Sequence, residues 1–166
     1  FKYFMPSTLV TSKPISLIFE FHGSYEFKKD ELPSDPLEGL SKTHALCQLA
    51  TRENCIVCFP AGEVVTQEDG SGAVNWQNSE KHLPFVDAML DFFMTSSPSV
   101  DPLRVYSTGQ SSGAIFSFVL AFYRSEKFAA ITPRAGQMNI DNQTQLPSRA
   151  VPIRVFAGEI DQTVIH

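Results

Sequence analysis

Two patterns of apolar and polar positions alternate along the chain: short continuous apolar runs and longer segments of helical periodicity. Short apolar runs without polar alternation are typical of strands that are buried on both faces of a sheet. In the segment 84–94, apolar residues recur every three or four positions, as they do along one face of a helix. The patterns predict strands over 1–6, 15–21, 56–60, 104–108, 129–133 and 152–157, and helices over 39–52, 84–94 and 114–122.

This order of strands and helices predicts the α/β class, with a mostly parallel central sheet covered by helices on both faces. Phe1 to Pro6 is expected as an outer strand and Ile15 to Phe21 as a central one. The long stretch Ala61 to Ser79 holds three glycines and the only tryptophan, which favours a surface loop near a functional site. We expect four of the segments to be neighbouring parallel strands, namely 15–21, 56–60, 104–108 and 152–157.

The composition indicates a globular protein. A length of 166 residues fits a single domain, residues 1–166, that is large enough to bury a core. The chain has 43% hydrophobic residues, yet no apolar run approaches the roughly 18 to 20 residues that cross a bilayer. A net charge of -5 without a basic cluster argues against a nucleic acid or an acidic membrane surface as partner. A neutral or weakly charged substrate fits better.

Cys55 and Cys58 have the spacing of a C-x-x-C motif, but both lie in a run that is typical of a strand. Residues three apart on a strand point to opposite faces of the sheet. The two thiols should therefore not converge on one metal ion, and we expect both to be core residues.

Residues 109–113 read Gly-Gln-Ser-Ser-Gly, a G-x-S-x-G pattern between a strand-like run and an apolar helical run. In a nucleophile elbow the central serine has a strained backbone that lifts its hydroxyl above the sheet, and the residues two before and two after it must be small. Both of those positions are glycine, which favours Ser111 as a nucleophile. A Ser/Gly turn that merely joins two elements is the alternative.

Seven segments in order resemble the α/β-hydrolases of the polyhydroxybutyrate depolymerase and feruloyl or acetylxylan esterase type, carbohydrate esterase family 1. They are 16–23, 50–60, 74–76, 85–87, 100–106 leading into the elbow, 128–131 and 155–161, and they span nearly the whole chain. The resemblance implies a serine esterase that needs no cofactor and no metal. It implies feruloyl or acetyl esters of polysaccharides, or polyesters of the polyhydroxyalkanoate type, as substrates, and a secreted or periplasmic location.

The resemblance also implies roles for individual residues. Ser111 would attack the ester carbonyl and form an acyl-enzyme. The backbone N–H groups of Ser112 and Ser24 would form the oxyanion hole. Asp161 would be the acid that orients the catalytic imidazole, with Glu159 as the competing carboxylate.

Two further residues are expected to contact the substrate, Trp76 and Gln110. If the protein is instead a binding protein on a hydrolase scaffold, Trp76 would act as its aromatic platform for sugars, although a tryptophan in the core is the commoner case. His22, in the loop expected to complete the oxyanion hole, is expected to position that loop rather than to react.

The catalytic histidine is the part of the triad that the sequence does not place. This fold orders its triad Ser, acid, His, and only His166 follows Asp161, on a tether too short to reach both partners. We expect the C-terminal helix and the catalytic histidine loop to lie beyond residue 166, and His44 and His82 to be structural or solvated. An inactive binding protein that has lost the base, and a serine peptidase of the same fold, stay open as alternatives.

Overall fold

The computed structural model describes residues 1–38, 40, 44–76, 79–96, 98–138 and 146–161. The strands are β1 (Lys2–Phe4), β2 (Ser16–Phe21), β3 (Tyr25–Phe27), β4 (Cys55–Phe59), β5 (Glu63–Thr66), β6 (Gly72–Asn75), β7 (Val105–Gln110) and β8 (Ala130–Arg134). The helices are α1 (Ala45–Arg52), α2 (Leu83–Thr95) and α3 (Ser112–Tyr123), with a short 3-10 helix, η1, at Ser79–His82.

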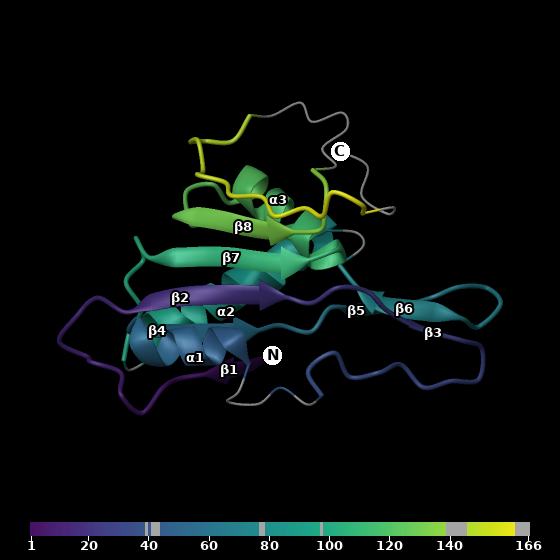
Figure 1. Ribbon diagram of the computed structural model, residues 1–166, viewed down its shortest axis with the longest axis horizontal. Helices are drawn as coiled ribbons and strands as arrows, with labels where there is room; N and C mark the ends of the chain where they lie inside the picture. The colour runs from purple at the N-terminus through teal and green to yellow at the C-terminus, as the bar shows by residue number, and fades with distance from the viewer. Residues whose placement is uncertain (39, 41–43, 77–78, 97, 139–145, 162–166) are drawn as a thin grey trace.

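A five-stranded central sheet has the order β1-β4-β2-β7-β8 (Figure 1). The pairs β2 with β4, β2 with β7 and β7 with β8 are parallel, and the outer strand β1 is antiparallel to β4. The segment 152–157 continues the sheet beyond β8 through two parallel bridges, Ile131 with Ile153 and Arg134 with Phe156. The expected parallel arrangement of β4, β2 and β7 is confirmed. The segment 152–157 is also parallel, but it pairs through isolated bridges rather than as a regular strand, and β8 lies between it and β7.

Helices cover both faces of this sheet, as the sequence predicts. Figure 1 shows α1 on the face nearer the viewer and α2 and α3 on the opposite face. On the α1 face, Cys47 and Ala50 pack against side chains of β4. The larger core lies on the other face, where α2 and α3 bury alternate side chains of β2, namely Leu17, Phe19 and Phe21.

The two cysteines of the C-x-x-C motif lie on opposite faces of β4. Cys55 packs in the cluster under α1, and Cys58 packs in the cluster under α2 with its Sγ 3.9 Å from Met89 Sδ. Both thiols are free and buried, so the prediction of core cysteines is confirmed.

The stretch 61–79 is not a simple surface loop, and this expectation was wrong. It contains β5 and β6, which pair with β3 in a three-stranded antiparallel sheet of order β3-β6-β5. A tight turn joins β5 to β6, with Gly70 at φ 86 and its N–H donating to the Gln67 carbonyl at 3.0 Å. In Figure 1 this small sheet extends past the carboxyl ends of β2 and β4.

The first helix is shorter than predicted. Helix α1 begins at Ala45, because His44 is its N-cap residue and accepts a hydrogen bond from the Leu46 N–H through its side chain. Of the predicted range 39–52, residues 39 and 41–43 lie outside the described residues. None of the described helices is long and apolar enough to cross a membrane.

Candidate active site

Ser111 has the backbone geometry of a nucleophile elbow. It lies between β7 and α3 with φ 52 and ψ -119, a left-handed conformation that costs a non-glycine residue about 1–3 kcal/mol. Its N–H donates to the carbonyl of Arg134 at 3.1 Å, and its own carbonyl accepts from the N–H groups of Ala114 and Ile115. The surrounding structure therefore holds the strained residue in place.

Positions 109 and 113 must be glycine because the backbone around them leaves no room for a side chain. A Cβ atom on Gly109 would lie 2.5 Å from the carbonyl oxygen of Gly113 and 2.8 Å from that of Phe21. A Cβ atom on Gly113 would lie 2.6 Å from the carbonyl oxygen of His22. The steric rule that predicts the elbow from the sequence is thus met at both positions.

The first test concerns this crowding. We expect Gly113→Ala to lower the free energy of unfolding by about 1–3 kcal/mol, because the new methyl group overlaps backbone atoms that cannot move independently. Urea unfolding followed by circular dichroism measures the change. Gly158→Ala is the matched control, since among the described residues a Cβ atom there meets only Asp161 Cβ, at 4.0 Å. Equal stability of the two variants would contradict the steric argument.

The two backbone groups expected to form the oxyanion hole belong to segments that flank Ser111. Ser112 is the first residue of α3, so its N–H is among those that have no acceptor within the helix. On the other side, a Cβ atom on Gly23 would lie 3.5 Å from Ser111 Cβ, which brings the loop after β2 against the nucleophile. Ser24 is the next residue of this loop, and its role as second donor stays a prediction.

His22 ties the loop after β2 to its neighbours. Its Nε2 accepts the Gly62 N–H at 2.8 Å, and its Nδ1 lies 2.5 Å from the Gly23 carbonyl oxygen. An accepting Nε2 places the proton of the neutral ring on Nδ1. Burial lowers the pKa of His22 from its ordinary value of 6.5, and the Gly23 carbonyl and the charge of Asp35 offset this only in part. This geometry fits the expected positioning role.

The lowered pKa of His22 predicts a pH dependence of stability. Below pH 6.5 the unfolded state binds more protons than the folded state, so the free energy of unfolding should fall as the pH drops toward the lower, folded-state pKa. In His22→Gln this part of the fall should be absent. Urea unfolding of both proteins between about pH 5 and 8 measures it. Superimposable pH profiles would show that His22 does not carry the effect.

Trp76 is a core residue, and the expectation that its ring contacts substrate was wrong. Only 1% of the residue is exposed, and its ring stacks on Phe116 with centroids 5.0 Å apart. Its Nε1–H donates to the carbonyl of His22 at 3.1 Å. Trp76 follows β6 directly, so the small sheet that the sequence analysis missed carries the ring under the loop after β2. Its contribution to the site is to hold that loop.

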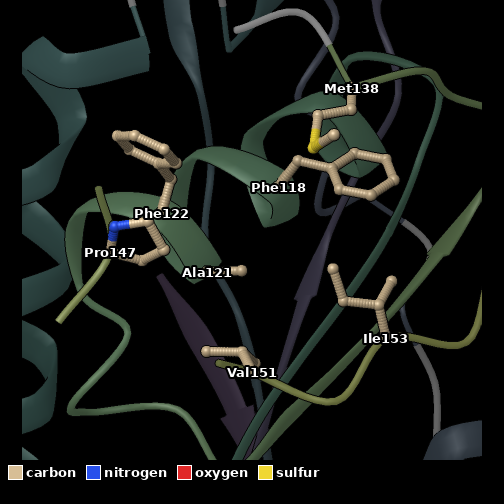
Figure 2. Close-up of a pocket in the computed structure, with 7 residues that line it drawn as sticks. All are labelled: Phe118, Ala121, Phe122, Met138, Pro147, Val151 and Ile153. Atoms are coloured by element: carbon tan, nitrogen blue, oxygen red, sulfur yellow. The ribbon is translucent and has the colours of Figure 1, made fainter. Parts of the chain in front are cut away.

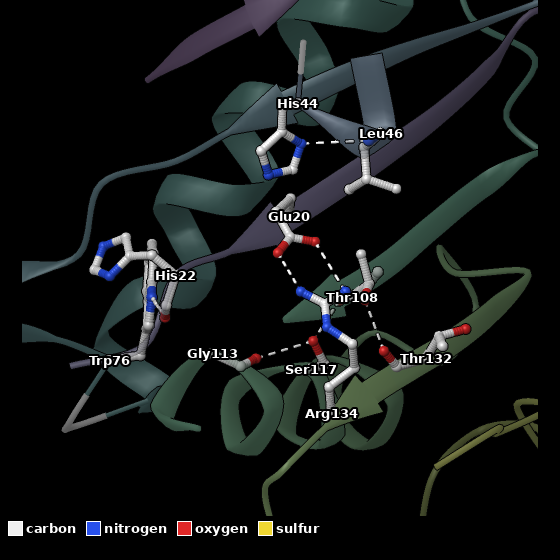
Figure 3. A network of polar contacts seen from close by, with 11 residues as sticks. Glu20, His22, His44, Leu46, Trp76, Thr108, Gly113, Ser117, Thr132 and Arg134 are labelled. Atoms are coloured by element: carbon white, nitrogen blue, oxygen red, sulfur yellow. Dashed lines mark hydrogen bonds and ion pairs between the residues drawn. The ribbon is translucent and has the colours of Figure 1, made fainter. Parts of the chain in front are cut away.

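Gln110 is exposed at the carboxyl end of β7, directly before Ser111. With Gly23 it lines a hollow of about 200 Å³ whose wall also includes polar side chains of Glu20, Tyr25 and Arg134. Figure 3 shows the Glu20 and Arg134 side chains turned toward each other. Gln110 is thus available to a ligand beside the nucleophile, and its contact with substrate stays a prediction.

Asp161 belongs to the same edge of the sheet as Ser111. The segment 152–157 runs parallel to β8, and Asp161 follows it through a turn in which its N–H donates to the Gly158 carbonyl at 3.2 Å. Parallel strands deliver their carboxyl ends to one edge, where ligands bind in open α/β sheets. Glu159, the competing carboxylate, is exposed in the same turn. Which of the two orients the base stays a prediction.

The histidines that precede the acid have structural surroundings. The His44 ring caps α1 and packs edge-on against Phe59. His82 is buried, with its ring edge-on to Trp76 and Phe116. Both fit the predicted structural role. His166 lies outside the described residues. Within the described part of the chain, no group of three or more His, Cys, Asp or Glu residues could hold a metal ion.

A second hollow, of about 250 Å³, was not expected from the sequence. It lies along the second half of α3, away from Ser111, and Figure 2 shows its lining side chains. That lining is apolar and includes Phe118, Phe122, Met138, Pro147, Val151 and Ile153. None of the described residues that line this hollow carries a nucleophile, an acid or a base.

Comparisons with known proteins agree with this architecture. No family model matches the chain. Over 162 residues the chain is 28% identical to the bifunctional acetylxylan esterase/xylanase XynS20E of Neocallimastix patriciarum. This alignment covers 97% of the chain and 21% of that protein. The acetyl xylan esterase structure from Aspergillus awamori superposes with a TM-score of 0.51 at 20% identity, over 87% of the chain and 50% of that structure.

A carboxylesterase of Bacillus cereus superposes with a TM-score of 0.59 at 18% identity, over 94% of the chain and 68% of that structure. The chain spans about a fifth of the curated relative and half of the acetyl xylan esterase structure. The chain therefore has the α/β-hydrolase fold and resembles the acetylxylan esterases and carboxylesterases of that fold, as its sequence predicts.

Proposed function

We propose that this protein is a serine esterase that hydrolyses carboxylic esters through an acyl-enzyme at Ser111. The observation that carries the proposal is the strained conformation of Ser111, φ 52 and ψ -119, between two glycines that the backbone keeps free of side chains. A serine in a plain connecting turn does not need this strain, whereas an elbow uses it to expose the hydroxyl.

In the proposed reaction, the Ser111 Oγ attacks the ester carbonyl while a base takes its proton. The carbonyl oxygen becomes an oxyanion, which the N–H groups of Ser112 and Ser24 stabilise, and collapse of this intermediate expels the alcohol and leaves an acyl-enzyme. The base gives its proton to the departing alcohol. Water, deprotonated by the same base, then attacks the acyl group, which leaves as the carboxylic acid and restores the serine. Each oxyanion donor is expected to contribute about 3–4 kcal/mol to transition-state stabilisation.

The base is proposed to be a histidine whose ring lies between Ser111 and Asp161. One ring nitrogen must reach the serine hydroxyl while the other donates to the carboxylate, so the two residues should be separated by the width of one imidazole and two hydrogen bonds, about 6–8 Å. The shared edge of Ser111 and the turn at Asp161 supports this assignment.

The proposed substrates are acetyl or feruloyl esters of polysaccharides, with polyesters of the polyhydroxyalkanoate type as the alternative. The curated relative is described as an acetylxylan esterase, which favours the acetyl esters. The polar hollow beside Gln110 offers hydrogen-bonding groups to a sugar, whereas a polyester would gain little from them. A secreted or periplasmic location would suit a polymeric substrate.

A substrate panel tests the proposal. We expect the natural full-length protein to hydrolyse p-nitrophenyl acetate, because a small acyl group meets few steric limits at the elbow. We also expect turnover of at least one of acetylated xylan and methyl ferulate, which represent the two proposed types of polysaccharide ester. The same protein pretreated with a fluorophosphonate is the control and should release no product. Absence of turnover on every ester, together with no fluorophosphonate labelling, would reject the esterase and leave a binding protein.

A further inference from the structure

We propose that the ion pair of Glu20 and Arg134 is a clamp that positions Ser111, an inference that rests on the proposed function. Arg134 Nη2 lies 2.5 Å from Glu20 Oε1, and its Nη1 lies 3.4 Å from Oε2 (Figure 3). The same Nη1 donates to Thr108 Oγ1 at 2.9 Å, and that hydroxyl donates to the carbonyl of Thr132 at 2.7 Å. One guanidinium thus joins side chains of β2 and β7 to the end of β8.

The register of the sheet places Glu20, Thr108 and Thr132 on one row, with Arg134 two residues further along β8. Glu20 is the Cα partner of Thr108, and Thr108 is the Cα partner of Thr132. Arg134 follows Thr132 by two positions and so points to the same face of β8. From there its long side chain reaches back across Thr108 to Glu20. The pair therefore spans the strand that leads into Ser111.

The strands joined by this pair lead to the parts of the candidate site. β2 runs into His22 and Gly23, of which Gly23 lies against Ser111, and β7 runs directly into Ser111. At the end of β8, the carbonyl of Arg134 accepts the Ser111 N–H at 3.1 Å. Fixing the Arg134 side chain therefore fixes a backbone atom that the nucleophile binds.

The turn after β8 contacts both the segment that leads to Asp161 and the elbow at Ser111. Ala135 has φ 46, and its N–H donates to the Phe156 carbonyl at 2.8 Å, in the segment that leads to Asp161. On the other side, a Cβ atom on Gly136 would lie 2.5 Å from Ala114 Cβ and 2.9 Å from the carbonyl oxygen of Ser111. The turn is packed between the elbow and the acid-bearing segment, so a shift of β8 would move both.

Because the side chain of Glu20 is mostly buried, its carboxylate depends on the ion pair with Arg134. Its side chain is 11% exposed and that of Arg134 is 38% exposed. A carboxylate with so little access to water depends on its partner, and the two-pronged geometry of arginine fixes direction as well as distance. A displacement of a reacting group by about 1 Å can cost about 10²-fold in rate. For a p-nitrophenyl ester, which has no sugar to occupy the polar hollow, loss of the clamp should thus show in the reactivity of Ser111 more than in substrate binding.

The test uses Arg134→Met and Glu20→Gln in the natural full-length protein. The matched control is Arg124→Met, which removes an arginine that also binds a carboxylate through two nitrogens, Asp87 at 2.8–3.0 Å, far along α3 from the elbow. Three readouts apply to each protein: the rate constant of fluorophosphonate labelling at Ser111, kcat and KM for a p-nitrophenyl ester, and hydrogen exchange of the Ser111 amide.

We expect Arg134→Met to lower the labelling rate and kcat by about 10- to 100-fold, to change KM by less than about threefold and to speed exchange of the Ser111 amide. Glu20→Gln keeps the shape of the side chain and one hydrogen bond to Arg134, so the labelling rate and kcat should fall by less. If Arg134→Met does not fold, Glu20→Gln provides the test. Arg124→Met should stay within about twofold of the unchanged protein in labelling and kcat, even if its Tm falls.

Unchanged labelling and unchanged amide exchange in both clamp variants would overturn the proposal. An equal loss of labelling in Arg124→Met would also overturn it, because the effect would then be one of general stability. A natural protein whose Ser111 neither reacts nor hydrolyses esters would refute the proposed function instead. In that case the amide exchange of Ser111 still decides whether the Glu20–Arg134 pair holds the elbow.

Discussion

Ser111→Ala is expected to abolish labelling by a fluorophosphonate and to lower kcat for ester hydrolysis by about 10⁶-fold, the size of the loss when the nucleophile of a known serine hydrolase is removed. Alanine keeps the backbone of the elbow, so the fold and substrate binding should persist. The residual rate would come from the oxyanion hole and from binding alone. Active-site labelling followed by mass spectrometry, and initial rates on p-nitrophenyl acetate, measure the two effects.

Ser112→Ala is the matched control for this experiment. The Ser112 Oγ is buried and has no hydrogen-bond partner among the described residues, while the backbone N–H that the proposed mechanism uses is unaffected by the substitution. We expect this variant to be labelled normally and to keep its kcat within about tenfold. Labelling that persists in Ser111→Ala and disappears in Ser112→Ala would reverse the assignment.

Asp161→Asn is expected to lower kcat by about 10⁴-fold, as the corresponding change does in a known Ser-His-Asp triad. The amide cannot hold the imidazole in the tautomer that accepts the serine proton, and it does not stabilise the imidazolium that forms. KM should change little, because the acid does not touch the substrate. Steady-state kinetics of the natural full-length protein measure both constants.

Glu159→Gln separates the two carboxylates of this turn. Glu159 is exposed, and its removal should leave kcat within about threefold of the unchanged protein. A large loss in Glu159→Gln together with normal turnover in Asp161→Asn would move the acid to Glu159. Large losses in both variants would argue that the turn itself, rather than one carboxylate, is required.

The elbow and the central sheet could be predicted because their rules are local. A Cβ atom on Gly109 would meet the carbonyl of Gly113 within one strand–turn–helix unit, so five consecutive residues carry the signal, although the end of β2 also crowds both glycines. The central strands can be recognised in the sequence as apolar runs, because helices bury them on both faces.

The parts that the sequence did not predict depend on distant residues. The strands β5 and β6 are short, β5 is partly exposed, and the glycines in and around them suggested a loop, although Gly72 is needed where β6 crosses the Phe27 ring. Trp76 is buried because Phe116 and Phe21 lie on it, and neither neighbour is near it in sequence. The Glu20–Arg134 pair joins residues 114 positions apart, which no local pattern can reveal.

The two thiols of β4 can report on local opening of the helical layers that cover the central sheet. Cys55 is sealed under α1 and Cys58 under α2, and burial raises the pKa of both, that of Cys55 to about 11. A thiol reagent can therefore react with either one only when the covering layer opens. The thiols lie on opposite sides of one strand. The rates at which a thiol reagent modifies Cys55 and Cys58 would therefore measure two openings separately: that of the α1 layer, and that of the layer formed by α2 and by α3, the helix that follows Ser111.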